Sequence, residues 1–129
     1  MARHVFLSFV AEDLQNVNLF RGQARNRNSA LVFDDYSVRV PYNSTNAAYI
    51  RTQIAAKIRS ASVTLCLIGP STSTSKWVDW EIEKSKDLGN KLVGVKLYSS
   101  LTCPVPPALR AAGAPVLDWD VPAIVRAIG

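Results

Sequence analysis

One glutamate in this sequence is expected at a position where a charge is costly. Residues 75–85 are SKWVDWEIEKS, and at about 100° per residue a helix there places Glu81 on the same apolar arc as Trp77. A carboxylate in apolar surroundings is usually hydrogen-bonded, ion-paired or functional. The other two acids of this helix, Asp79 and Glu83, fall on the opposite side. We expect both to face solvent and to be dispensable for chemistry.

Two roles for Glu81 stay open on the residues alone. An ion pair with Lys84, or with an arginine of a neighbouring helix, is the commoner reason for an acid at such a boundary. The alternative is a functional carboxylate. It is favoured by position, because this helix is expected to begin at the rim of a ligand cleft, with Trp77 one turn before Glu81 on the same face.

The cleft follows from the order of elements along the chain, in which strand and helix patterns alternate. Strands are expected at 4–10, 30–37, 62–69, 91–98 and 116–119, and helices at 12–25, 47–61, 75–88, 106–112 and 120–128. Strict alternation predicts an α/β fold with a parallel sheet between two layers of helices. We expect one domain over residues 1–129, a flavodoxin-like three-layer αβα sandwich with strand order 2-1-3-4-5. Ligands of such sheets bind beyond the carboxyl ends of the strands where the order reverses, here beside strands one and three.

Composition excludes several classes of protein. The net charge is +5, but the basic residues are scattered and no nucleic-acid reading element is present, so nucleic-acid binding is not expected as the main role. No apolar run approaches the roughly 18–20 residues that cross a bilayer, and no signal peptide is evident, so we expect a cytoplasmic protein. A single histidine and two cysteines without CxxC spacing predict no metal site, with Cys66 a core residue.

Familiar catalytic motifs are also missing. No GxGxxG or GxxxxGK[ST] follows the first strand, and no GxSxG occurs, which argues against a glycine-rich dinucleotide site and a serine hydrolase. Glu12 and Asp13 follow the first strand as the acidic pair of a receiver domain does. However, the third strand ends in LIGPS, without the aspartate that a receiver phosphorylates.

The segments VFLSF, FDDYS, SVTLCLIGPST and SKWVDWEIEKS, followed by GNKLVGVKLY, together resemble TIR domains. The resemblance is greatest to the bacterial TIR-like (ThsB-like) proteins of Thoeris antiphage systems. It covers roughly residues 4–98, and WVxxEI is its most specific part. The family implies a TIR fold.

The resemblance also implies an activity, cleavage of NAD⁺ at the nicotinamide–ribose bond. Glu81 then matches the catalytic glutamate, and Trp77, Phe6, Ser8 and Asp35 match substrate-binding positions. NAD⁺ is the substrate, and no cofactor or metal is expected. The product is ADP-ribose or a cyclic ADP-ribose isomer, a nucleotide second messenger that activates a separate effector protein. Self-association through TIR surfaces is implied as well, with residues 38–46 as the family's BB loop.

One departure concerns the pyrophosphate of NAD⁺. Animal TIR domains carry an arginine just after strand one, where this sequence has Val10 and Ala11. Arg39 and Arg51 are the candidates to replace it.

Two other functions are compatible with the sequence. The chain could be a non-catalytic TIR assembly module. It could also be a nucleoside or nucleotide transferase of similar fold, which would need Glu12 or Asp13 as a second acid at the rim.

Overall fold

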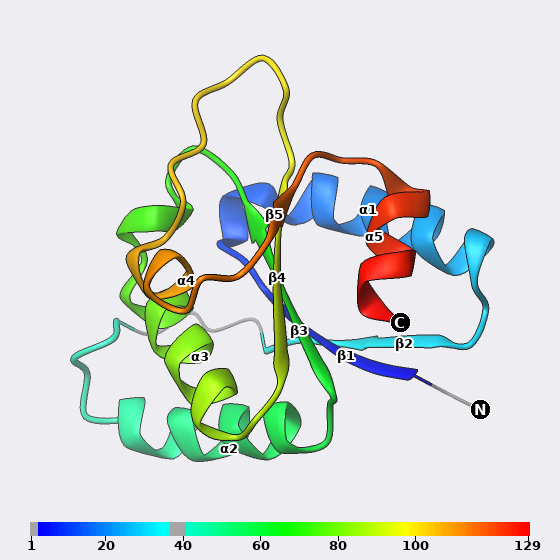
Figure 1. Ribbon diagram of the computed structural model, residues 1–129. Coiled ribbons are helices and arrows are strands. Elements are labelled where there is room, and N and C mark those ends of the chain that lie inside the picture. The colour runs from blue at the N-terminus through cyan, green and yellow to red at the C-terminus, as the bar shows by residue number, and fades with distance from the viewer. Residues whose placement is uncertain (1–2, 37–40) are drawn as a thin grey trace.

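A five-stranded sheet, parallel throughout, forms the centre of the molecule (Figure 1). The computed structural model describes residues 3–36 and 41–129. The strands are β1 (Arg3–Ser8), β2 (Leu31–Asp34), β3 (Val63–Ile68), β4 (Lys91–Lys96) and β5 (Val116–Leu117). Their order is β2-β1-β3-β4-β5. The expected strand order and the parallel pairing are therefore confirmed.

Helices cover both faces of this sheet, as the alternating pattern predicted. They are α1 (Leu14–Arg27), α2 (Ala47–Arg59), α3 (Lys76–Asp87), α4 (Pro107–Ala111) and α5 (Val121–Ile128). One face is covered by α1 and α5, whose apolar residues share one core cluster. The other face is covered by α2, α3 and α4 (Figure 1). None of these helices in the described part of the chain has the length and apolar composition needed to cross a bilayer.

Alternation along β1 determines which side chains meet α3. Successive residues of a strand point to opposite faces of the sheet. Val5 and Leu7 belong to the core under α1 and α5, whereas Phe6 packs against the helices of the opposite face. Ser8 follows Phe6 by two residues, so its hydroxyl also faces the layer that contains α3.

The helix α3 buries the arc that its sequence predicted. Its buried residues are Val78, Glu81, Ile82 and Ser85. Ser75 caps the helix, because its hydroxyl accepts a hydrogen bond from the Val78 backbone N–H at 3.2 Å. Gly89, with φ of 82°, follows the helix in the left-handed conformation that glycine favours.

Two element boundaries differ from those expected at the edge that carries the site. The first strand ends at Ser8 rather than at residue 10, and a 3-10 turn over Ala11–Asp13 precedes α1. The second strand ends at Asp34 rather than at residue 37. Asp35 therefore lies in the segment that follows β2 rather than within the strand. Cys66 is fully buried in the core, as expected.

Candidate active site

A hydrogen bond between Ser8 and Glu81 joins the end of β1 to the middle of α3. Ser8 Oγ donates to Glu81 Oε1 at 2.6 Å, and the two residues are 0% and 4% exposed. Of the two roles left open for Glu81, the ion pair is not found among the described residues. Within residues 3–36 and 41–129, neither Lys84 nor any arginine lies within salt-bridge distance of this carboxyl group. Glu81 is therefore a buried acid held by a hydroxyl rather than by a cation.

Burial changes the proton affinity of this acid. Desolvation raises the pKa of Glu81 to about 8, the Ser8 hydrogen bond partly opposes that rise, and the negative charge of Asp35 adds to it. The side chain thus changes its protonation state near neutral pH. A cationic group placed beside it would favour the carboxylate form, because opposite charges stabilise each other.

Asp35 is the second acid near this site. It follows β2 directly, and its carboxylate forms an ion pair with the Arg21 guanidinium of α1. The Asp35 side chain is 17% exposed, and its charge acts on Glu81. The structure therefore brings Asp35 and Glu81, which are expected to belong to one site, close enough for their charges to interact.

Trp77 lies one turn before Glu81 on α3, within a cluster of aromatic rings. Its ring centroid is 5.0 Å from that of Tyr42 and 6.4 Å from that of Trp80, both in edge-to-face geometry. Phe6 is fully buried in a core cluster with isoleucines of α2, and Trp77 and Trp80 pack against that cluster. Phe6 thus supports the site from the core, and its contact with a substrate stays a prediction.

The loop after β2 is only partly described. Arg39 and the rest of 37–40 lie outside the described residues, so the expected contact of Arg39 with a pyrophosphate stays a prediction. Arg51, the other candidate for a pyrophosphate, is in α2 with its guanidinium carbon 5.1 Å from the centroid of the Tyr42 ring. This is a cation–π contact, and it places Arg51 beside the aromatic cluster that includes Trp77.

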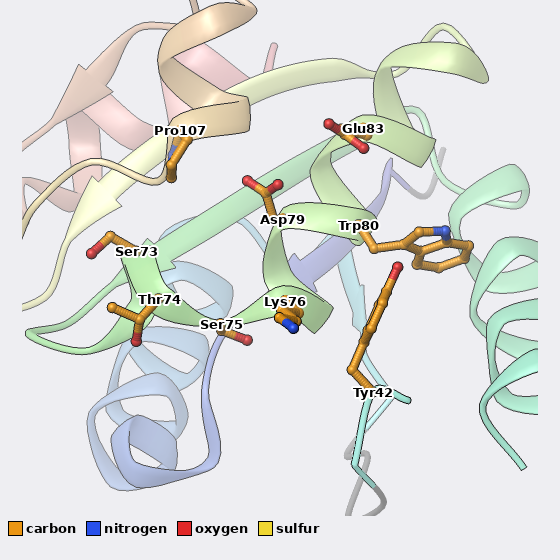
Figure 2. Close-up of a pocket in the computed structure, with 9 residues that line it drawn as sticks. All are labelled: Tyr42, Ser73, Thr74, Ser75, Lys76, Asp79, Trp80, Glu83 and Pro107. Atoms are coloured by element: carbon orange, nitrogen blue, oxygen red, sulfur yellow. The ribbon is translucent and has the colours of Figure 1, made fainter. Parts of the chain in front are cut away.

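The opposite side of α3 holds the two acids that were expected to face solvent. Figure 2 shows Asp79 and Glu83 at a hollow of about 240 Å³ that Tyr42 and Trp80 also line. Glu83 is exposed, as expected. The expectation is wrong for Asp79, which is partly buried and accepts a 3.0 Å hydrogen bond from the Ala108 backbone N–H at the start of α4. Its role is structural, because it satisfies a free donor of that helix.

Asp13 is a second buried acid, and the sequence predicted no structural role for it. Asp13 is 4% exposed, and its Oδ1 accepts a 3.0 Å hydrogen bond from the Tyr98 hydroxyl. The carboxylate lies directly against Gly69, where an added Cβ would overlap it. Desolvation raises the pKa of Asp13. The signal in the sequence was the glycine that follows β3, since a close backbone approach often requires one.

The arrangement can stabilise positive charge. When Glu81 ionises beside a cation, its carboxylate, together with the charge of Asp35, produces a negative potential at the edge of the sheet where strand order reverses. Within the described residues, no group of three or more histidine, cysteine, aspartate or glutamate side chains is placed to hold a metal ion.

Known proteins share sequence with most of this chain. Residues 6–101 match the family model described as Thoeris protein ThsB, TIR-like domain. A protein of Bacillus cereus (strain MSX-D12), provisionally named cyclic ADP-D-ribose synthase ThsB1, is 34% identical over 102 residues. The match covers 75% of this chain and 53% of that protein. The chain thus spans about half the length of this curated relative.

Solved structures share the fold. TIR domains in the structure of the activated Roq1 resistosome, which directly recognises the pathogen effector XopQ, align with a TM-score of 0.53 at 17% identity. That alignment covers 97% of this chain and 69% of the other. A fungal multi-domain β-N-acetylglucosaminidase aligns with a TM-score of 0.51 at 15% identity, over 87% of this chain and 14% of the other. At these identities the likeness concerns the fold alone.

Proposed function

We propose that this chain, which belongs to the family of Thoeris ThsB TIR-like domains, cleaves NAD⁺ at the nicotinamide–ribose bond. The observation that carries this proposal is the buried carboxyl group of Glu81, bonded to Ser8 at 2.6 Å. It lies at the carboxyl edge of the sheet, beside the strand at which the order reverses. We assign the catalytic role to Glu81.

The chemistry needs one carboxylate. Nicotinamide leaves NAD⁺ as a neutral molecule, so its departure requires no general acid, while positive charge develops on the ribose. A carboxylate beside the ribose stabilises that charge in the transition state, which is where an interaction raises the rate. The approach of the cationic nicotinamide ring also favours the ionised form of Glu81, whose pKa burial raises to about 8.

The remaining site residues have supporting roles in this proposal. Ser8 fixes the orientation of the Glu81 carboxyl group, and we also assign it a contact with the ribose or nicotinamide of the bound substrate. Trp77 supplies an aromatic wall one turn away, with Phe6 packed in the core beneath it. Asp35 adds negative potential. This potential opposes the ionisation of Glu81, but it favours a substrate that carries or develops positive charge.

The product depends on which nucleophile attacks the ribose after nicotinamide departs. Water gives ADP-ribose, and a nitrogen or hydroxyl of the same molecule gives a cyclic isomer. The name of the Bacillus cereus relative, a cyclic ADP-D-ribose synthase, supports the cyclic product. We propose that this nucleotide is a signal that activates a separate effector protein in bacterial antiphage defence, and that the chain self-associates through its TIR surfaces.

The geometry gives little support to a nucleotide transferase that uses a second rim acid. Such an enzyme would need Glu12 or Asp13 as its base. Glu12 accepts a 2.9 Å hydrogen bond from the Ser71 hydroxyl, and Asp13 is packed against Gly69 and bonded to Tyr98. Both acids are therefore engaged in contacts within the protein.

Incubation of the purified chain with NAD⁺ tests the proposal directly. Free nicotinamide is followed by chromatography, and the second product is identified by its mass, since a cyclic isomer is lighter than ADP-ribose by one water. The reaction is run alone and with an extract of phage-infected cells, which supplies a trigger. We expect nicotinamide release and a product with the mass of a cyclic isomer. Absence of nicotinamide under both conditions would contradict the proposed activity.

A further inference from the structure

A groove between α2 and α3, on the outer side of the helical layer, is lined by three positively charged side chains. It has a volume of about 340 Å³, at the lower end of the range of roughly 300–1,000 Å³ typical of small-molecule sites. Residues four apart on a helix share a face, so its lining consists of two stripes, one from each helix. The α2 stripe is Arg51, Thr52, Ala55 and Arg59, and the α3 stripe is Trp80 and Lys84.

Within the described residues, the three cations of this groove lack acidic partners. The lining there includes no acid, and in the same part of the chain no salt bridge involves Arg51, Arg59 or Lys84. Elsewhere, by contrast, Arg21 is paired with Asp35 and Lys57 with Asp34. Arg51 also contacts the Tyr42 ring, whereas Arg59 and Lys84 line the hollow without such a contact, and like charges that line one hollow repel one another. An anion bound there would remove that repulsion.

Trp80 adds an aromatic wall to the same groove. Its indole extends from α3 toward the neighbouring α2 (Figure 2), while Ala55 on the opposite stripe leaves room in front of it. Asp79 and Glu83 line a neighbouring hollow, to which Trp80 and Pro107 also contribute. An aromatic ring beside several cations suits a ligand that carries both phosphates and a flat base, because stacking and charge-assisted hydrogen bonds then act together.

We propose that the α2–α3 groove binds a nucleotide, with its phosphates on Arg59 and Lys84 and its base against Trp80. This site is separate from that of Glu81, whose carboxyl group points inward to Ser8 on β1. The proposal does not depend on NAD⁺ cleavage, since it concerns binding alone.

Calorimetric titration with three probes tests this assignment. ADP carries both phosphates and a base, pyrophosphate carries only the phosphates, and adenosine carries only the base and sugar. We expect ADP to bind most tightly, pyrophosphate more weakly, and adenosine not at all. Arg59→Gln and Lys84→Gln should each weaken ADP binding by about tenfold, because each removes a charge-assisted hydrogen bond. Added salt should weaken it further.

Matched variants show whether the ligand binds in the groove itself. Arg27→Gln removes an exposed cation of α1 outside the groove, and it should leave ADP binding unchanged. Trp80→Leu should weaken ADP binding but not pyrophosphate binding, and the retained pyrophosphate binding shows that the variant is folded.

Three results would overturn the proposal. The first is ADP binding that is absent, or that is insensitive to Arg59→Gln and Lys84→Gln. The second is an equal loss in Arg27→Gln, which would indicate non-specific attraction to a positively charged surface. The third is a short single-stranded DNA that binds through the same cations when ADP does not, which would assign the groove to nucleic acid instead.

Discussion

Ser8 Oγ and Glu81 Oε1 lie 2.6 Å apart and connect two segments that are 73 residues apart in the sequence. Both side chains are buried, so the hydrogen bond forms where water does not compete with it. It fixes the carboxyl group of α3 at the end of β1 and partly offsets the effect of burial on the pKa of Glu81. The catalytic role that we propose for Glu81 depends on this position.

Replacement of Ser8 by alanine should shift the pH profile of nicotinamide release. The hydroxyl donates to the carboxylate, so its loss raises the pKa of Glu81 above its value of about 8. The rising limb of kcat/KM against pH should move to higher pH by about one to two units, since a hydrogen bond to a charged group contributes about 1.5–3 kcal/mol. Ser100→Ala, at an exposed serine, is the control. An unshifted profile in Ser8→Ala would argue against this role of the hydroxyl.

Glu81→Gln should make the stability of the protein less sensitive to pH. The pKa of Glu81 is about 8 in the folded chain and about 4.5 when unperturbed, so the folded state holds the proton more tightly. Its contribution to stability is full below about pH 4.5 and is lost as pH rises to 8. Relative to the variant, the wild-type free energy of unfolding should fall by about 1.4 kcal/mol per pH unit in this window.

Urea unfolding at pH 5, 6, 7 and 8 measures that difference. Glu83→Gln serves as the matched control, because Glu83 is exposed on the same helix, and its difference from the wild type should not vary with pH. If the wild type and Glu81→Gln had parallel pH dependences, the carboxyl group would not be desolvated in the folded protein.

Gly69→Ala should destabilise the chain through Asp13. The added methyl group would overlap the Asp13 carboxylate, and overpacking of this kind costs roughly 1–3 kcal/mol. Asp13→Ala removes the overlapping group, so the double variant should lose less stability than the sum of the two single variants. Gly22→Ala is the control, since nothing lies within 4 Å of a Cβ there. Additive effects of Gly69→Ala and Asp13→Ala would show that the two residues do not contact each other.

Much of the fold could be predicted because its signals are local. Apolar runs alternating with helical stripes predict a parallel sheet, and burial of one helix arc follows from spacing at 3.6 residues per turn. The burial of Glu81 and Cys66 was predictable in this way. Strand ends were less certain, because apolar residues such as Phe9 and Val10 continue past the last paired residue of β1.

Contacts between distant segments could not be predicted from spacing. Periodicity placed Glu81 on a buried arc but gave no information about the residue opposite it, so an ion pair and a functional carboxylate both stayed open. The same limit explains Asp79. Its position on the polar arc suggested solvent, whereas a short helix that follows a proline-rich connection brings the Ala108 N–H within 3.0 Å.

The carboxyl group of Glu81 is the part of the molecule on which the proposed activity depends most. The decisive measurement is the rate of nicotinamide release from NAD⁺ by the wild type, Glu81→Gln and Glu83→Gln under one activating condition. We predict that Glu81→Gln lowers kcat by at least about two to three powers of ten, as expected for the loss of transition-state charge stabilisation. Glu83→Gln should keep the wild-type rate. Equal rates for the wild type and Glu81→Gln would contradict the catalytic role of this carboxylate.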